Sequence, residues 1–225
     1  MIWYVDIELP SVVVDPAKKD NFDRVRALRT QVLGEIAQMP SESILYSDVT
    51  PELMREKNVV ALALSGNTSD WVQYDFSTFD PLKQIITSGS VPVIGLCGGQ
   101  QLLAYLYGGD CGPLRKLRPG EPDPADFAPG WFKEVGYKPV SVVKDDPIFE
   151  GLGTEPVFFE SHYWQVSRVP QDFETLASTE NCKVQVFRHK QLPVYGTQVH
   201  PEVNSAEHRD GRKLIGNFFK IAGLI

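Results

Sequence analysis

Cys97 is the residue whose neighbours most strongly suggest chemistry. It lies within Gly-Leu-Cys-Gly-Gly at positions 95–99, after the apolar run 91–96 and before a segment with helical apolar spacing, residues 100–107. Small residues around a nucleophile let the chain turn sharply from strand to helix, which leaves the side chain exposed on a strained backbone. A helix N-terminus behind the sulfur also favours thiolate over thiol. The stretch therefore predicts a cysteine nucleophile.

Two other interpretations of this stretch stay open. Free cysteine is among the most buried residue types, so a lone cysteine after a strand is often a packing residue. A phosphate-binding turn is the second interpretation, although Gly-x-Gly-x-x-Gly and the Lys-Ser/Thr ending are both absent. The rest of the chain must decide between them.

A catalytic thiol requires a base, usually histidine, and that base requires an acceptor that fixes its tautomer. His200 ends an apolar run in the segment YGTQVHPE. Residues two apart in an extended chain face the same way, so Glu202 can lie beside the His200 ring. A surface His-Pro-Glu segment is the alternative. His162, in ESHYWQV, suits a ligand-facing loop or a half-buried structural position, whereas His189 and His208 have charged neighbours and are predicted to be solvated.

The composition limits the class of protein. A length of 225 residues with 42% hydrophobic content suits one medium-sized α/β domain, which we expect to span residues 1–225. A formal charge of -7 argues against nucleic-acid binding, and the basic residues of LRKLRPGE predict a solvated loop. The chain has no apolar run of membrane-spanning length and no visible export signal, so we expect a cytoplasmic protein that binds no membrane.

The three cysteines also bear on location and on metal binding. Cys97, Cys111 and Cys182 form no Cys-x-x-Cys pair and leave one cysteine unpaired in any disulfide scheme. This usage suits a reducing compartment. We expect no metal site and no cofactor.

The elements that must position Cys97 alternate between strand and helix in the first half of the chain. Predicted strands are residues 2–7, 43–48, 58–66 and the run that ends at Cys97; predicted helices are residues 21–39, 50–57, with Thr50 as N-cap, and 80–89. Alternation of this kind predicts a parallel sheet whose ligands bind beyond the carboxyl ends of the strands. Both LSGN and GLCGGQ lie at such ends.

The second half has a different pattern. Residues 111–131 are rich in Pro and Gly and predict a long ordered loop. Short strands, mixed or antiparallel, are predicted at residues 133–143, 155–160, 173–179, 182–189 and 192–199. A closing helix over residues 209–221 is expected to bury Leu214, Ile215, Phe218 and Ile221.

Two motifs together make the chain recognisable. Gly95-Leu-Cys97-Gly-Gly99-Gln-Gln101 and the later Gly196-Thr-Gln-Val-His200-Pro-Glu202 resemble the class I glutamine amidotransferase family. The segment ALSGN falls where the family has its oxyanion loop, and DPIFEGLG, ESHYWQV and VFRHKQLPVYGTQVHPE resemble its later segments. The resemblance implies a flavodoxin-like α/β fold, an open parallel or mixed sheet with helices on both faces.

The resemblance implies a glutaminase. Cys97 would attack the side-chain amide carbon of glutamine, His200 would move the proton, and Glu202 would orient His200. Water would then hydrolyse the γ-glutamyl thioester. The residue chemistry agrees, because amide cleavage needs a thiolate, a proton shuttle and donors for a developing oxyanion. Since no acceptor domain fits in 225 residues, ammonia would pass to a separate synthase protein. The alternatives are a γ-glutamyl hydrolase without a synthase partner and a non-catalytic regulatory protein.

The resemblance also implies an oxyanion hole. Its backbone donors would be the N–H groups of Gly98 and of the loop residues Gly66 and Asn67. Family members generally have Gly where this chain has Asn67. Asn tolerates positive φ better than other non-glycine residues, so the loop is either preformed with Asn67 in the left-handed region or misaligned until a partner binds. The second case predicts slow basal turnover.

Four further residues are implied to contact the substrate. Gln101 matches the family glutamine that contacts the bound glutamine. Ser161, His162 and Tyr163 match the loop that binds the α-amino and α-carboxylate groups.

Overall fold

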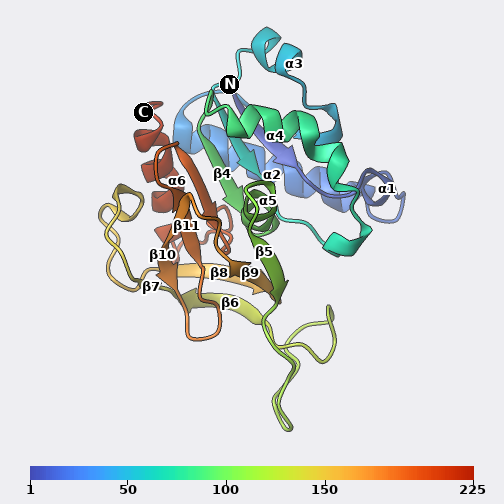
Figure 1. The fold of residues 1–225 in the computed structure, drawn as a ribbon, viewed down its shortest axis with the longest axis vertical. Coiled ribbons are helices and arrows are strands. Elements are labelled where there is room, and N and C mark those ends of the chain that lie inside the picture. The colour runs from blue at the N-terminus through green and yellow to red at the C-terminus, as the bar shows by residue number, and fades with distance from the viewer.

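A central sheet of eight strands organises the computed structural model, which describes residues 1–225 (Figure 1). Its strands are β1 (Ile2–Asp6), β2 (Ser41–Leu45), β3 (Ala61–Leu64), β4 (Val93–Leu96), β7 (Ser141–Val142), β10 (Phe173–Ser178), β11 (Val186–His189) and β12 (Val194–Thr197). Their spatial order is β2-β1-β3-β4-β12-β11-β10-β7. The strands from β2 to β12 in this order run parallel, and β11, β10 and β7 continue the sheet in antiparallel pairs.

Helices cover both faces of this sheet. They are α1 (Pro10–Val13), α2 (Lys19–Ala37), α3 (Pro51–Glu56), α4 (Asp80–Thr87), α5 (Gly98–Leu106) and α6 (Asp210–Ile221), with short 3₁₀ helices at Tyr46–Asp48, Trp71–Gln73, Phe76–Phe79 and Pro147–Phe149. Residues of α3, α4 and α5 pack in the hydrophobic cluster on one face, and residues of α2 and α6 pack in the cluster on the other. The expected open α/β sheet with helices on both faces is confirmed.

The buried parallel strands contribute side chains to both clusters. In β1, Trp3 and Val5 belong to one cluster, whereas Ile2 and Tyr4 belong to the other. Successive side chains of a strand point to opposite faces, so a strand covered on both faces is apolar at every position. This is why the opening run of the chain is continuously apolar.

Two small antiparallel sheets lie beyond the central sheet. One pairs β5 (Asp110–Pro113) with β9 (Trp164–Arg168), and the other pairs β6 (Glu134–Pro139) with β8 (Val157–His162). The segment between β5 and β6 extends away from the body of the molecule as an irregular loop (Figure 1). The loop predicted over residues 111–131 is therefore confirmed for residues 114–131, whereas residues 111–113 belong to strand β5.

Several boundaries differ from the sequence-based expectations. Helix α5 begins at Gly98 rather than at residue 100, and β9 and α1 were not expected. Thr50 does cap α3, because its hydroxyl accepts a hydrogen bond from the Leu53 N–H at 3.1 Å. Ile221 is only partly buried, since it lies in the last turn of α6.

Candidate active site

The sheet register brings the two sequence motifs together. Leu96 of β4 pairs with Thr197 of β12, and the Cys97 N–H donates to the Thr197 carbonyl at 2.7 Å. The two chain segments therefore leave the sheet side by side at its carboxyl edge. Cys97 then lies beside Gln198, and His200 follows two residues later.

Cys97 occupies a strained turn between β4 and α5. Its φ is 52° and its ψ is -105°, a conformation that non-glycine residues rarely adopt. The neighbouring glycines are required by close packing: a Cβ on Gly95 would lie 2.5 Å from the Gly99 backbone, and a Cβ on Gly99 would lie 2.6 Å from the Leu64 carbonyl. The expectation of an exposed nucleophile is wrong in one respect, because Cys97 is only 7% exposed and is reached through cavities.

Cys97, His200 and Glu202 are brought together as the sequence predicts. The Nδ1 atom of His200 lies 2.8 Å from Oε1 of Glu202, which leaves Nε2 as the ring nitrogen for Cys97. Burial opposes ionisation of the thiol, but the charge of His200 and a hydrogen bond from it lower the pKa of Cys97. The pKa of His200 is raised well above its usual value, since Cys97 and Glu202 outweigh its burial. The pair therefore favours thiolate and imidazolium.

Glu202 is the carboxylate that contacts His200, whereas the buried acidic residues Asp6 and Glu160 have different partners. Asp6 forms an ion pair with Arg26 at 2.6 Å, and an oxygen of Glu160 lies 3.1 Å from His162. Arg29 of α2 lies 3.8 Å from Oε1 of Glu202 and donates to its backbone carbonyl at 3.2 Å. Burial raises the pKa of Glu202, but His200 outweighs this effect and the pKa is lowered. Glu202 is thus ionised beside the histidine.

The loop that carries Gly66 and Asn67 lies against the start of α5. The N–H groups of both residues donate no hydrogen bond within the protein, and Gly98, as the first residue of α5, has no intrahelical acceptor for its own N–H. A Cβ on Gly98 would lie 3.0 Å from the Asn67 nitrogen and 1.9 Å from its Oδ1, so the two backbones are in close contact. Free backbone donors therefore gather beside Cys97.

Asn67 does not take the left-handed conformation. The non-glycine residues with positive φ are Gln38, Asn58, Cys97 and Ala128. The side-chain amide of Asn67 donates to the Ser69 carbonyl at 2.7 Å and to the Tyr74 hydroxyl at 3.3 Å. The alternative of a preformed left-handed Asn67 is therefore wrong, and these two hydrogen bonds hold its side chain in the observed conformation.

Glu8, two residues after the end of β1, is hydrogen-bonded to the residues that follow Asn67 in this loop. Its Oε2 accepts from the N–H and the hydroxyl of Thr68, both at 2.6 Å, and its Oε1 accepts from the Ser69 hydroxyl at 2.5 Å and the Leu9 N–H at 2.8 Å. Burial raises the pKa of this carboxyl, but the hydrogen bonds from Ser69 and Thr68 outweigh it and the pKa is lowered. An ionised Glu8 therefore fixes the residues directly after Asn67.

A cavity of about 460 Å³ opens on one side of the Cys97 sulfur. The lining residues include all four that the family resemblance assigns to substrate: Gln101, Ser161, His162 and Tyr163. A smaller cavity of about 270 Å³, which also contains Cys97, is lined by His200 and Glu202. The larger one is within the size range of small-molecule sites. Cys97 therefore lies between the larger cavity, which can admit a substrate, and the smaller cavity, which is lined by His200.

The side chain of Gln101 is engaged within the protein. Its Oε1 accepts from the Trp71 indole N–H at 2.8 Å, and its amide nitrogen donates to Oε1 of Gln198 at 3.0 Å. Ser161 and Tyr163 are partly exposed in the cavity, and the Tyr163 hydroxyl bonds to Asp70. The structure thus places these residues at the cavity but gives the Gln101 side chain internal partners.

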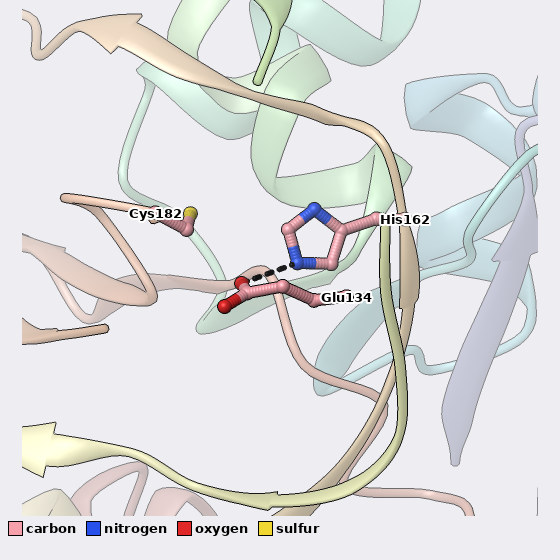
Figure 2. Close-up of side chains that lie close together, drawn as sticks. All are labelled: Glu134, His162 and Cys182. Atoms are coloured by element: carbon pink, nitrogen blue, oxygen red, sulfur yellow. Dashed lines mark ion pairs between the residues drawn. The ribbon is translucent and has the colours of Figure 1, made fainter. Parts of the chain in front are cut away.

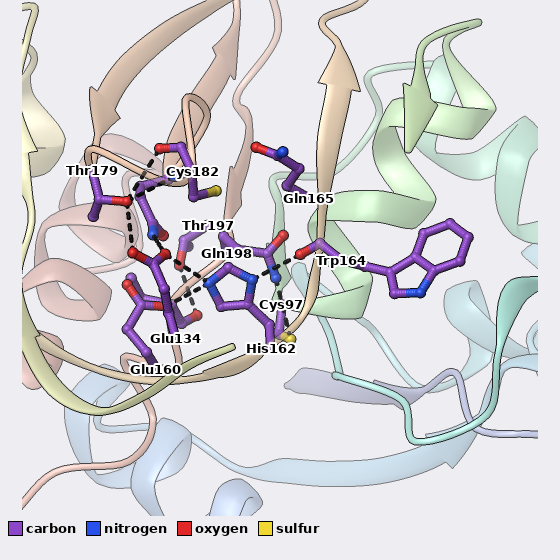
Figure 3. A network of polar contacts seen from close by, with 12 residues as sticks. Cys97, Glu134, Glu160, His162, Trp164, Gln165, Thr179, Cys182, Thr197 and Gln198 are labelled. Atoms are coloured by element: carbon purple, nitrogen blue, oxygen red, sulfur yellow. Dashed lines mark hydrogen bonds and ion pairs between the residues drawn. The ribbon is translucent and has the colours of Figure 1, made fainter. Parts of the chain in front are cut away.

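His162 lies in strand β8 and not in a loop, which corrects the sequence-based interpretation (Figure 3). Its Nδ1 lies 2.7 Å from the Trp164 carbonyl, and its Nε2 lies 3.2 Å from Glu134 and 3.1 Å from Glu160. Burial lowers the pKa of His162, but the two carboxylates outweigh it and raise the pKa to about 10. The ring is therefore a buried imidazolium at the cavity wall.

The group of side chains that could hold a metal ion is Glu134, His162 and Cys182, whose ligand atoms lie within 4.8 Å of one another (Figure 2). Both oxygens of Glu134 already accept hydrogen bonds, from Thr179 and Gln185, each at 2.8 Å. Burial raises the pKa of the Cys182 thiol well above its usual value. These partners fit a hydrogen-bonded ion pair better than a metal ligand set, since a cysteine ligand must be a thiolate.

The other two histidines are not solvated as expected. His208 stacks on Tyr137 with ring centroids 4.0 Å apart, and Nδ1 of His189 accepts from the N–H groups of Gln191 and Leu192. Both are partly buried, and neither lines a cavity that contains Cys97. They therefore have structural contacts.

Comparison with known proteins identifies the class. The chain belongs to the class I glutamine amidotransferase family, because the family model "Glutamine amidotransferase class-I" matches residues 25–222. No helix has the length and apolar character needed to cross a membrane.

Two relatives and one solved structure show which members of the family this chain is similar to. The glutamine-hydrolyzing GMP synthase subunit of Pyrococcus abyssi is 34% identical over 183 residues, which cover 81% of this chain and 86% of that protein. The corresponding protein of Methanopyrus kandleri is 35% identical over 185 residues, covering 82% and 87%. The solved structure of a putative GMP synthase subunit from Thermoplasma acidophilum matches with a TM-score of 0.70 and 25% identity, covering 99% of this chain and 94% of that one.

Proposed function

We propose that this protein is a glutaminase that hydrolyses the side-chain amide of glutamine through a Cys97 thioester and supplies ammonia to a separate synthase subunit. The observation that carries this proposal is the arrangement of Cys97, His200 and Glu202 at the edge of an open cavity. Membership of the glutamine amidotransferase family supports the same chemistry.

In the proposed reaction the Cys97 thiolate attacks the amide carbon of glutamine. The N–H groups of Gly98 and of the Gly66-Asn67 loop stabilise the oxyanion, and imidazolium His200 gives its proton to the departing ammonia. Water then attacks the thioester with His200 as the general base, which releases glutamate and restores the thiolate. Glu202 stays ionised and holds the His200 ring in orientation.

The larger cavity is the proposed site of the glutamine substrate. Ser161, His162 and Tyr163 would bind its α-amino and α-carboxylate groups. His162 is a buried imidazolium at this end of the strand, paired with Glu134 and Glu160. We assign Gln101 to support of the cavity wall rather than to direct substrate contact, because its amide has protein partners on both ends.

The synthase partner is proposed from the relatives, which are named as glutamine-hydrolyzing subunits of GMP synthase. We propose that this chain, as a single domain, works with the synthase subunit of such an enzyme in the cytoplasm. Three free cysteines support a reducing compartment.

Ammonia release from glutamine, measured for the chain alone and with a purified GMP synthase subunit, tests the proposal. We expect slow release alone and faster release with the subunit, and none from Cys97→Ala. Fast release that no synthase alters would favour a γ-glutamyl hydrolase. Absence of release with and without the synthase would favour a regulatory protein and overturn the proposal.

A further inference from the structure

Three buried side chains form a continuous hydrogen-bonded path to the Cys97 sulfur. The Trp71 indole N–H donates to Oε1 of Gln101 at 2.8 Å, and Nε2 of Gln101 donates to Oε1 of Gln198 at 3.0 Å. Nε2 of Gln198 then donates to Sγ of Cys97 at 3.4 Å (Figure 3). We call Trp71, Gln101 and Gln198 the amide network. Its members are at most 4% exposed, so water does not compete for these bonds.

The indole at one end determines the direction of every bond in the network. An indole N–H is only a donor, so the atom of Gln101 that faces it must be the amide oxygen. The Gln101 nitrogen then faces Gln198 and requires an oxygen there. The Gln198 nitrogen is consequently the atom that faces the sulfur. The donor-only indole therefore excludes the flipped orientation of both amides.

The network also has a rigid anchor. The Trp71 ring packs against Tyr74, Phe76 and Tyr105, with ring centroids 4.9, 5.8 and 5.5 Å apart. Trp71 lies in the 3₁₀ helix that follows the loop of Asn67, and it lines the larger cavity. The sulfur is therefore linked by hydrogen bonds to the segment that carries the oxyanion loop.

We propose that Gln198 is a further catalytic residue, which donates to the Cys97 sulfur, and that Gln101 and Trp71 are positioning residues that orient its amide. This inference rests on the proposed role of Cys97 as nucleophile. A donor to a thiolate is stronger than one to a neutral thiol, so the network stabilises the attacking form. It also fixes the side-chain rotamer that points the sulfur into the cavity. When the thioester forms, the sulfur loses its negative charge and this donor matters less.

Thiol alkylation at Cys97 measures this role without requiring turnover. The rate of carboxamidomethylation by iodoacetamide is followed against pH in the full-length protein, with the site assigned by peptide mass spectrometry. We expect Gln198→Met, which retains length but removes the donor, to raise the midpoint of the profile by about one pH unit. At neutral pH this corresponds to roughly tenfold slower labelling of Cys97.

Trp71→Phe tests the positioning role because it retains an aromatic ring and removes the indole N–H together with part of the ring system. It should shift the midpoint in the same direction by a smaller amount, since the amides of Gln101 and Gln198 can then flip. Trp131→Phe is the matched control, because Trp131 stacks on Lys116 outside both cavities and should leave the midpoint unchanged. Thermal unfolding of each variant confirms that the folded state is being labelled.

The outcomes separate this inference from the proposed function. Unchanged midpoints in folded Gln198→Met and Trp71→Phe would overturn the network's role, even if wild-type protein releases ammonia from glutamine. Shifted midpoints in both variants, with no shift in Trp131→Phe, would support the network even if no glutaminase activity were detected. An equal shift in the Trp131→Phe control would also overturn it, because the effect would then be non-specific.

Discussion

Replacement of Glu8 by Gln should slow the reaction without contact between residue 8 and the substrate. The Glu8 carboxylate accepts hydrogen bonds from the N–H groups of Leu9 and Thr68, each on a different oxygen. It also accepts hydrogen bonds from the hydroxyls of Thr68 and Ser69. A glutamine amide has one oxygen and one nitrogen. The hydroxyls can rotate to accept from the new nitrogen, but a backbone N–H cannot. Glu8→Gln must therefore leave the N–H of Leu9 or of Thr68 without an acceptor.

The expected loss of stability follows from this lost acceptor. An unsatisfied buried N–H costs about 1–3 kcal/mol, and at this chain length each kcal/mol lowers Tm by roughly 2–4 °C. We expect a loss of about 2 kcal/mol in the free energy of unfolding and a Tm about 4–8 °C lower. Because Thr68 follows Asn67 directly, the loop should loosen, and kcat measured with the synthase subunit present should fall about tenfold, within the limit of 10²- to 10³-fold for a lost oxyanion donor. KM should change little.

The pH dependence of stability gives a second check on Glu8. Its pKa is lowered in the folded protein from the ordinary value of 4.5, so its contribution to stability is fully present above that pH and is lost as pH falls through the folded pKa. The stability difference between wild type and Glu8→Gln should therefore shrink in acid.

Calorimetry and steady-state ammonia release on Glu8→Gln carry out these tests. Glu42→Gln is the matched control, because Glu42 is exposed on β2 and makes no side-chain hydrogen bond. The control should match wild type in both assays. A Glu8→Gln protein that is destabilised but retains wild-type kcat would refute the proposed effect of the Glu8 hydrogen bonds on catalysis. A Glu8→Gln protein with unchanged stability would refute the argument that a backbone N–H loses its acceptor.

Three further outcomes follow from the site. Cys97 should be labelled first of the three cysteines by a glutamine-analogue electrophile, since burial raises the pKa of both other thiols; faster labelling elsewhere would contradict its role. Glu202→Gln should lower kcat about 10²-fold or more, and His200→Ala should be more damaging; full activity in Glu202→Gln would require another carboxylate. Asn67→Gly should raise basal ammonia release up to roughly tenfold, since glycine reaches positive φ without the usual 1–2 kcal/mol penalty; a mutant no faster than a slow wild type would argue against a gated loop.

The sequence was sufficient for the central sheet and for the residues around the nucleophile. The apolar run and the closely spaced glycines predict β4 and the turn at Cys97, because a strand followed by a tight turn has few alternative conformations. The two-residue period placed Glu202 beside His200. The same two-residue period places Gln198 on the same side of the chain as His200 and Glu202. The donor to Cys97 could therefore have been predicted from the sequence, and it was missed.

Other parts of the site could not be predicted because they depend on contacts between distant segments. Glu8 and Thr68 meet only after β1 and β3 pair, and Arg29 reaches Glu202 only through the packing of α2. His162 looked suited to a loop because its polar neighbours hid the alternation of a short strand. Its partner Glu134 lies on the paired strand β6, and a sequence without pairing information does not indicate that register.

Direct detection of the covalent intermediate tests whether Cys97 is the nucleophile that attacks glutamine. Wild-type protein is mixed with glutamine, quenched in acid within the turnover time, and digested for peptide mass spectrometry. We expect a glutamyl adduct on the Cys97 peptide, absent from Cys97→Ala and from samples without glutamine. Ammonia release that persists in Cys97→Ala, or an adduct found on Cys111 or Cys182 instead, would contradict it.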